Sequence, residues 1–233
     1  KNRDQRFYHS IQYDSCMFYN ELITLHKGGN LHRTAVDCKT PGNGYIPITN
    51  YIWRKYIYVN AERIFWNNPT DYHYVIFRYG RALLNKAEAL LGLAKYDASK
   101  VSSAVATFNR TRTTHGNLPP SIATSLADAW HDYKIERHVD LALEGDYYWS
   151  LLRWGMYGGE ANHGKPAGDI IPELSSPATF VEISQDRHRM FVGTVGYTNA
   201  DRTFSKKRYL FPITQSIINA NSAINDSDQN PGW

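Results

Sequence analysis

The chain has 233 residues, a length that accommodates one large domain or two small ones. Its composition, 42% hydrophobic and 21% charged residues, is that of a folded globular protein and excludes a disordered chain. No apolar run approaches the ~18 residues that a membrane-spanning helix needs. The net charge of +4 is scattered apart from the cluster Lys206-Lys207-Arg208, which argues against nucleic-acid binding.

Two cysteines, Cys16 and Cys38, allow either one disulfide bond or two buried thiols. Neither lies in a C-x-x-C arrangement, so a redox or zinc role is not expected. The chain begins at Lys1 without a charged and apolar leader, and we expect any targeting segment to have been removed.

Residues 1–77 are rich in Tyr, Trp, Asn, Gly and Pro and show little helical periodicity. Strong turn signals stand at residues 26–30 (HKGGN) and 40–44 (TPGNG). Residues 51–59 (YIWRKYIYV) are β-branched and aromatic, which predicts a short strand. We therefore expect long packed loops with a few strands.

Residues 78–153 have helical periodicity. The first predicted helix covers residues 79–94 and buries an apolar repeat of Leu84, Ala87, Leu91 and Ala94. Asp97 is the expected N-cap of a second helix. Its apolar face consists of Val101, Val105, Phe108 and the stem of Arg112. The short turn between the two helices predicts an αα-hairpin.

A third helix is predicted after a Gly-Asn-Leu-Pro-Pro loop at residues 116–120. Ser125 and Asp128 have the spacing of a capping box, and the helix continues through Trp130, Tyr133, Arg137 and Leu141. Gly145 ends it, and Asp146 can cap a shorter helix that contains Trp149, Leu152 and Arg153.

Residues 154–233 return to loops rich in Gly and Pro. Within them, residues 209–213 (YLFPI) predict a short strand that ends at proline. Thr214 or Ser216 can cap one turn of helix at residues 217–219.

The sequence carries no catalytic signature. It lacks H-E-x-x-H, G-x-S-x-G and a Walker loop. His131 and His138 are separated by about 10 Å of helical rise, too far to bind one metal ion, so we expect surface or core histidines. Glu136 and Glu144 lie on one helical run and cannot flank a substrate as glycosidase carboxylates do.

Buried ion pairs are the alternative role for these acidic residues. We expect three glutamates to pair with three arginines and so to connect the helices, and we assign all six to structure: Glu88, Glu136, Glu144, Arg112, Arg137 and Arg153.

The aromatic excess has two interpretations. The chain holds 17 Tyr, 6 Trp and 9 Phe, and eleven aromatic residues lie between Tyr45 and Tyr79. Most such rings fill a core and place their polar tip at the surface. Rings on exposed loops beside Asn, Arg and Asp would instead form flat surfaces suited to sugars, because one face of a pyranose is rich in C–H groups and its edge carries hydroxyls.

At this point several segments, in this order along the chain, resemble the SusD/RagB family. Residues 78–89 (RYGRALLNKAEA) resemble its helix signature, and residues 108–112 (FNRTR) its "LNxxR" helix end. Residues 135–145 (IERHVDLALEG) with 152–155 (LRWG) resemble its "IxxERRxELxxEGxRxxDLRRWG" block. Residues 208–213 (RYLFPI) with 230–233 (NPGW) resemble its "LFPIP…QNPGY" ending. Further matches are residues 3–8 (RDQRFY) to "DPRF" and 54–56 (RKY) to "RKY".

Four positions depart from the family pattern. Gly80 stands where Ala is usual, Gln5 where Pro is usual, Asp140 where Glu is common, and Ser150 where Asp is common.

The resemblance implies a mainly α-helical fold, with TPR-like αα-hairpins packed against a loop-rich region with a few short strands. Residues 1–233 would form the C-terminal portion of a SusD/RagB-like domain. Within it lie a loop-rich aromatic region (1–77), a helical TPR-like core (78–153) and a loop-rich C-terminal region (154–233). The first helix pair alone would expose an apolar face that another segment or a partner covers.

The resemblance also implies a function. Family members are surface lipoproteins of the bacterial outer membrane that capture glycans or other nutrients, without catalysis or a cofactor, for import through a SusC-like TonB-dependent transporter. Membrane attachment would use only a lipid anchor on an earlier part of the chain. Loop aromatics are the candidates for stacking on the ligand: Tyr19, Tyr45, Trp53 and Trp66.

Two other functions remain as alternatives. One is a TPR-like protein–protein docking scaffold with ligand binding elsewhere, and the other, less favoured, is a glycosidase. Singly presented rings suit a sugar, whereas a contiguous apolar patch suits a protein partner.

Overall fold

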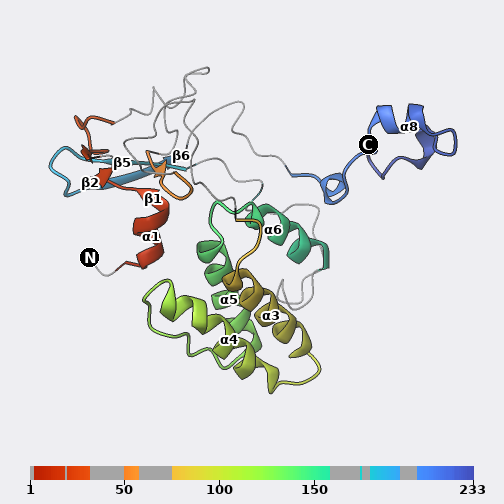
Figure 1. Ribbon diagram of the computed structural model, residues 1–233, viewed down its shortest axis with the longest axis horizontal. Coiled ribbons are helices and arrows are strands. Elements are labelled where there is room, and N and C mark those ends of the chain that lie inside the picture. Colours follow the sequence, from red (N-terminus) through yellow and green to blue (C-terminus); the bar gives the residue numbers. More distant parts are fainter. Residues whose placement is uncertain are drawn as a thin grey trace.

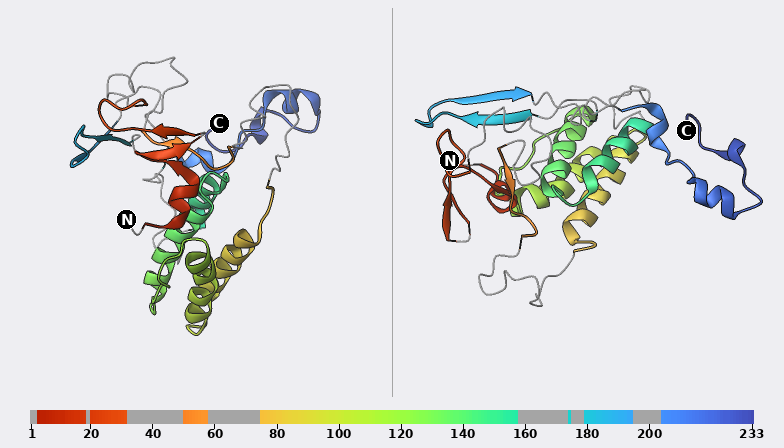
Figure 2. Two further views of the ribbon diagram at one scale, coloured as in Figure 1. Left: turned by 60° about the vertical axis from the view of Figure 1, so that its left-hand side comes forward. Right: turned by 90° about the horizontal axis from the view of Figure 1, so that it is seen from above.

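The computed structural model describes residues 3–18, 20–31, 50–57, 75–157, 174, 179–194 and 204–233. Within these ranges the fold is mainly helical, as expected, with short two-stranded sheets. Figures 1 and 2 show the helices α3 to α6 grouped together, the strands gathered at one end beside α1, and α8 at the other end. No helix among the described residues is long and apolar enough to cross a membrane.

The first two core helices, α3 (Tyr79–Leu93) and α4 (Lys100–Thr114), form the predicted αα-hairpin. Ala87 and Ala104 are fully buried, and their small side chains allow the helices to approach closely. Ser99, and not the expected Asp97, occupies the N-cap position of α4. The Asp97 side chain instead accepts a hydrogen bond from the Ser99 backbone N–H in the turn before the helix. Thr111, rather than the stem of Arg112, completes the buried face of α4.

The other two core helices are α5 (Leu126–Asp140) and α6 (Asp146–Tyr157). Ser125 caps α5 as predicted, because its hydroxyl oxygen accepts a hydrogen bond from the Asp128 backbone N–H at 3.0 Å. The connection to α6 contains Gly145 at a φ of +70°, a left-handed conformation that glycine adopts without steric cost.

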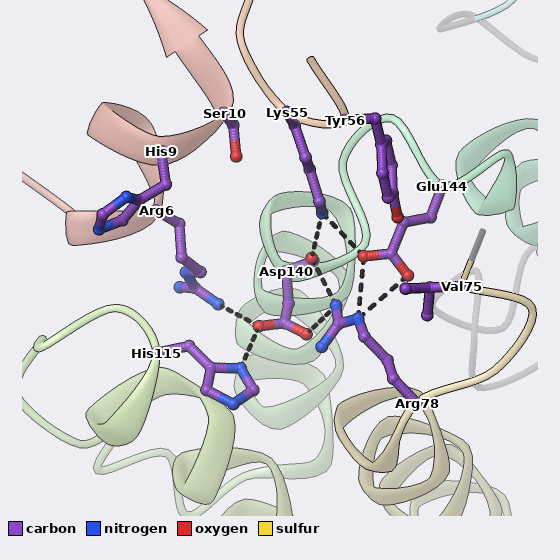
Figure 3. A pocket seen from close by; sticks show the side chains of 10 residues that line it. All are labelled: Arg6, His9, Ser10, Lys55, Tyr56, Val75, Arg78, His115, Asp140 and Glu144. Carbon is purple, nitrogen blue, oxygen red and sulfur yellow. Dashed lines mark hydrogen bonds and ion pairs between the residues drawn. The ribbon is translucent and has the colours of Figure 1, made fainter. Parts of the chain in front are cut away.

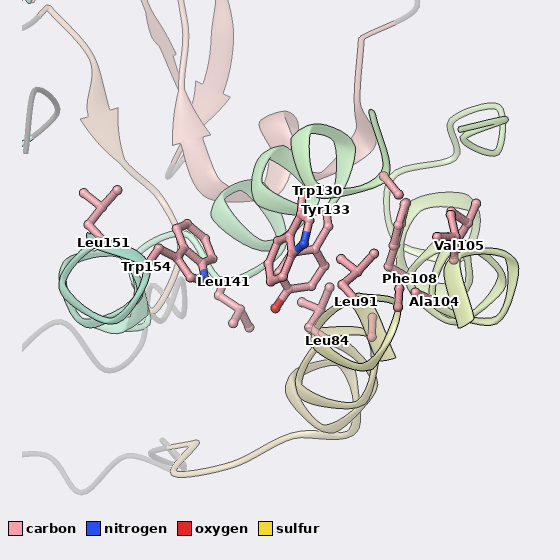
Figure 4. Packing of buried hydrophobic residues seen from close by; sticks show 14 of the residues in the cluster. Leu84, Leu91, Ala104, Val105, Phe108, Trp130, Tyr133, Leu141, Leu151 and Trp154 are labelled. Carbon is pink, nitrogen blue, oxygen red and sulfur yellow. The ribbon is translucent and has the colours of Figure 1, made fainter. Parts of the chain in front are cut away.

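Four large aromatic residues fill the space between these helices (Figure 4). The ring of Tyr133 lies 6.2 Å from that of Phe108, 5.6 Å from that of Trp130 and 6.3 Å from that of Trp154, measured between centroids. Leucines from α3 and the α5–α6 connection pack around them. Burial of each large side chain contributes roughly 1.5–3 kcal/mol, so this cluster stabilises the helical core.

The N-terminal region contains a helix that the sequence did not predict, α1 (Gln5–Ser10). The side chain of Asp4 caps it by accepting a hydrogen bond from the Arg6 backbone N–H at 2.9 Å. Strand β1 (Ile11–Gln12) follows and pairs antiparallel with β4 (Ile52–Trp53). The strand predicted over residues 51–59 is therefore shorter than expected, with a turn at 55–56 and residues 58–59 outside the described ranges.

A small hairpin of β2 (Cys16–Phe18) and β3 (Glu21–Ile23) packs beside this pair. Cys16 is a buried free thiol next to Ile23 and Leu25, and Cys38 lies outside the described residues. The predicted turn at residues 26–30 is present, whereas the one at 40–44 also lies outside them.

The third sheet is a hairpin of β5 (Thr179–Ile183) and β6 (Met190–Thr194), in a region that we expected to be loops. A backbone hydrogen bond from Lys27 to Ile183 joins this hairpin to the N-terminal region. Strands from opposite ends of the sequence therefore lie together.

The prediction of a strand at residues 209–213 is wrong, because these residues form no strand in the structure. Residues Lys206–Tyr209 form a 3-10 turn, η3, and the extended residues after it pair with no described strand. Instead, the side-chain amide of Gln229 donates to and accepts from the Ile213 backbone, both at 2.8 Å. Helix α8 (Gln215–Ala220) follows with Thr214 at its N-cap position, and a short 3-10 turn, η4 (Asp226–Asp228), precedes the end.

Candidate functional site

Of the four residues predicted to stack on a ligand, the structure describes one. Trp53 lies on β4, opposite Ile11 of β1, and 67% of its surface is exposed. Its backbone carbonyl accepts a hydrogen bond from the Gln12 side chain at 3.0 Å, which fixes the strand while the indole faces solvent. Tyr19, Tyr45 and Trp66 lie outside the described residues.

A cavity of about 350 Å³ lies where α1, the β4 turn, α3 and the end of α5 meet (Figure 3). Its walls are unusually rich in charged side chains. The lining residues are Arg6, His9, Ser10, Lys55, Tyr56, Val75, Arg78, His115, Asp140 and Glu144.

The carboxylate of Asp140 has three partners around this cavity. Its Oδ1 atom lies 3.2 Å from Arg6 Nη1 and 2.7 Å from His115 Nδ1. Its Oδ2 atom accepts from Arg78 Nη2 at 2.5 Å. Burial alone would raise the pKa of Asp140, but the hydrogen bond from His115 and the charge of Arg78 outweigh it and hold that pKa below its ordinary value.

Glu144 forms a second centre on the other side of the cavity. Lys55 Nζ donates to its Oε1 atom at 2.7 Å and also to the backbone carbonyl of Ala142 at 2.9 Å. Arg78 Nε donates to the same carboxylate at 2.9 and 3.1 Å. Lys55 and Arg78 therefore hold the turn that connects α5 to α6.

Both carboxylates are buried and surrounded by cationic partners. The side chains of Asp140 and Glu144 are only 1% and 5% exposed, and each carries at least two cationic partners. A general acid or base must reach the proton that it transfers. No group of three or more potential metal ligands occurs among the described residues either.

A second ion-pair group is centred on Glu88, in α3. Its carboxylate accepts hydrogen bonds from Arg153 Nε at 2.8 Å and from the Tyr133 hydroxyl at 2.6 Å. Burial alone would raise the pKa of Glu88, but the contacts with Arg153 and Tyr133 lower it overall. The pKa of Tyr133 is raised by burial and by the charge of Glu88.

Asp146 completes this group from the first turn of α6. Its carboxylate accepts from Arg137 Nη2 at 2.7 Å and from Arg137 Nε at 2.8 Å. The Ser150 hydroxyl donates to Asp146 at 2.8 Å. Ser150, at the position where the SusD/RagB pattern commonly has Asp, thus contacts a carboxylate that lies one helical turn earlier in the chain.

The predicted ion pairs are confirmed in part. Glu88 pairs with Arg137 and Arg153 as expected. Glu136, however, pairs with Arg6, while Arg112 donates to the carbonyl of Pro119.

Glu144, the remaining glutamate, pairs with Lys55 and Arg78. Arg6 and Lys55 stand in two of the short matched segments, but no local spacing identifies partners so far away in the chain. Both histidines behave as expected. His131 and His138 are both exposed residues, and the His138 ring stacks on that of Tyr147 with centroids 3.7 Å apart.

Comparison with known proteins gives a consistent result. A solved SusD-like carbohydrate binding protein from Bacteroides fragilis has a similar fold, with a TM-score of 0.55 and 20% sequence identity. The match covers 97% of this chain and 42% of that one. No curated protein matches. The family model described as SusD family matches residues 1–233, and the chain therefore belongs to the SusD family.

Proposed function

We propose that this protein binds glycans, or another nutrient, at the surface of the bacterial outer membrane without cleaving them. The observation that carries the proposal is the family match over residues 1–233. The Bacteroides fragilis protein with the similar fold is described as carbohydrate binding, which supports the same ligand class here.

The proposed binding residues are aromatic side chains on loops and short strands. Trp53 supports the proposal, because its indole is largely exposed on a strand whose backbone is fixed by Gln12. Tyr19, Tyr45 and Trp66 complete the set from the sequence. The rings would stack on the C–H face of a sugar, and neighbouring polar side chains would bind its hydroxyls.

The protein is proposed to act without catalysis or a cofactor. The acidic side chains of the cavity support this, because Asp140 and Glu144 are buried and paired with cations. Their geometry is that of a structural connection between α1, α3 and α5.

Affinity electrophoresis against a panel of soluble polysaccharides tests the binding proposal. We expect retardation on at least one glycan, and we expect Trp53→Ala to reduce it. The matched control is Tyr96→Ala, which removes an exposed ring beyond the end of α3. Absence of retardation on every glycan, or release of reducing ends by the purified protein, would contradict the proposal.

Docking onto a SusC-like TonB-dependent transporter is the second part of the proposal. Four large apolar or aromatic side chains within five residues at the entry to α3 are exposed, which favours a protein contact. They are Val75, Ile76, Phe77 and Tyr79. We expect Ile76→Ser with Phe77→Ser to reduce copurification with the transporter while glycan retardation persists. Unchanged copurification would exclude this surface.

A further inference from the structure

The densest basic segment of the sequence lies at the start of η3 and plays no part in the core. Lys207 and Arg208 are exposed, and no carboxylate among the described residues is within ion-pair distance of either. The two acidic residues of η4 form hydrogen bonds within the C-terminal segment. Asp228 accepts from the Asn225 backbone N–H, and Asp226 accepts from the Gln215 side chain. No described carboxylate therefore neutralises the positive charge at η3.

Exposed aromatic rings surround this basic turn. The Lys207 ammonium lies 4.3 Å from the ring centroid of Trp233, whose surface is 45% exposed. Phe211, two residues after η3, is 64% exposed, and its ring lies 5.6 Å from that of Trp149 on α6. Trp149 is itself 51% exposed. Figure 1 shows the start of this C-terminal segment near α6, and the rest of it extending away from the strands.

These rings are held in place before any ligand arrives. The indole Nε1 of Trp233 donates to the backbone carbonyls of Lys207 and Leu210, both at 3.0 Å. The carbonyl of Phe211 accepts from the Asn230 side chain at 2.6 Å. Trp149 projects from a helix whose opposite face is buried in the core. Such preorganisation lowers the entropy cost of binding.

Cations and exposed rings side by side fit one class of ligand better than others. A neutral sugar would use the rings and leave the cations unsatisfied. An apolar protein surface would bury the cations without partners, at a cost in free energy. A sugar that carries a carboxylate or a sulfate uses both, because its ring stacks on an aromatic face while its anion pairs with a cation.

We infer that the surface formed by Trp149, Lys207, Arg208, Phe211 and Trp233 binds an anionic glycan. This inference rests on the proposed function and specifies its ligand class. It also places a binding surface at the opposite end of the molecule from Trp53.

The test measures binding to four soluble polysaccharides at near-physiological salt, ~0.15 M. Chondroitin sulfate carries sulfates, polygalacturonate carries carboxylates only, and dextran and starch are neutral. We expect tighter binding to one or both anionic polymers than to the neutral ones. Comparison of chondroitin sulfate with polygalacturonate then shows whether the surface prefers a sulfate or a carboxylate. The double variant Lys207→Gln with Arg208→Gln should weaken that binding about tenfold, since it removes both cations that would pair with the anionic groups. Phe211→Ala should weaken it as well.

The matched control is Arg187→Gln with Arg189→Gln in the β5–β6 turn, which removes the same charge from another exposed site. An equal loss in this control would indicate non-specific attraction and would overturn the inference. Binding to neutral glycans alone, unaffected by the Lys207 and Arg208 changes, would overturn the inference but leave the proposed function intact. No binding to any polysaccharide would overturn both.

Discussion

Arg6 and Glu136 lie 130 residues apart in the chain and form a buried ion pair with two hydrogen bonds. Nη1 and Nη2 of the guanidinium donate to the two carboxylate oxygens at 2.5 and 3.0 Å. The Thr111 hydroxyl donates to the same carboxylate at 2.7 Å. This pair attaches α1, and with it the N-terminal strands, to the helical core.

Removal of the Arg6 side chain should strongly destabilise the protein. We expect Arg6→Ala to lower the free energy of unfolding by about 3–5 kcal/mol, because Glu136 is left charged and buried. Urea denaturation measures this change. The control Arg110→Ala removes an exposed guanidinium that stacks on Tyr79 and should cost less than about 1 kcal/mol. A similarly small loss for Arg6→Ala would contradict the structural role of the pair.

The carboxylate at position 146 should be movable to position 150. Asp146→Ser should lower the free energy of unfolding by about 3 kcal/mol, because Arg137 loses its bidentate partner. The exchange variant Asp146→Ser with Ser150→Asp should recover at least half of that loss. If the exchange is as unstable as Asp146→Ser alone, then the two positions are not equivalent carboxylate sites.

Gly80 should be preferred over alanine only while Arg78 is present. A Cβ at position 80 would clash with Arg78 Nη1 and lie 3.1 Å from Asp140 Oδ2, so the guanidinium must move away from its carboxylate. We expect Gly80→Ala to destabilise the wild type by about 1–2 kcal/mol, because the disturbed charged hydrogen bonds outweigh the better helix propensity of alanine.

In an Arg78→Ala background the same change should be neutral or stabilising by up to about 1 kcal/mol. The double-mutant cycle measures this coupling directly. Equal effects in both backgrounds would show that the contact with Arg78 is not what selects glycine.

The stability of the protein should fall in acid. The pKa values of Glu88, Asp140 and Asp146 are lowered in the folded state, whereas unfolded carboxyl groups titrate near their ordinary values of about 4. Below that pH the unfolded chain binds more protons than the folded one, so the free energy of unfolding decreases as the pH falls. The stabilisation is fully present above about pH 5 and is lost as the pH drops through the folded pKa values.

Urea denaturation at pH 7, 5, 4 and 3 measures this dependence. Asp140→Asn should make the profile flatter between about pH 5 and 3, because one titrating carboxyl group is removed. A variant profile parallel to that of the wild type would show that Asp140 does not contribute to the acid sensitivity.

The helices of the core could be predicted because their signals are local. The apolar repeat over residues 79–94 matches α3, and Ser125 with Asp128 marks the start of α5. A helical repeat and a cap involve residues within one or two turns of each other. Both partners of each interaction therefore lie in one short stretch of sequence, where the pattern can be recognised.

The missed elements lack such local signals. Helix α1 is only six residues long, and Arg6 fixes it through a partner in α5. The β5–β6 turn is stabilised by Asp186, which accepts from the His188 backbone N–H, and contains no glycine or proline. The apolar residues 209–213 looked like a strand, but the Gln229 side chain takes the place of a neighbouring strand.

Of the predicted stacking residues, only Trp53 lies within the described residues, and it is exposed as a binding residue must be. The charged cavity was not predicted as a unit, because its residues come from five separate segments. The rings beside Lys207 and Arg208 are likewise brought together from α6 and the end of the chain.

The sequence by itself determined the family, the helical core and the absence of a recognisable catalytic motif, since each depends on residue types at short, fixed spacings. The tertiary structure alone decided which charges meet. An ion pair such as Arg6 with Glu136 forms only after the chain has folded, and the choice of partner depends on burial and geometry rather than on distance along the sequence.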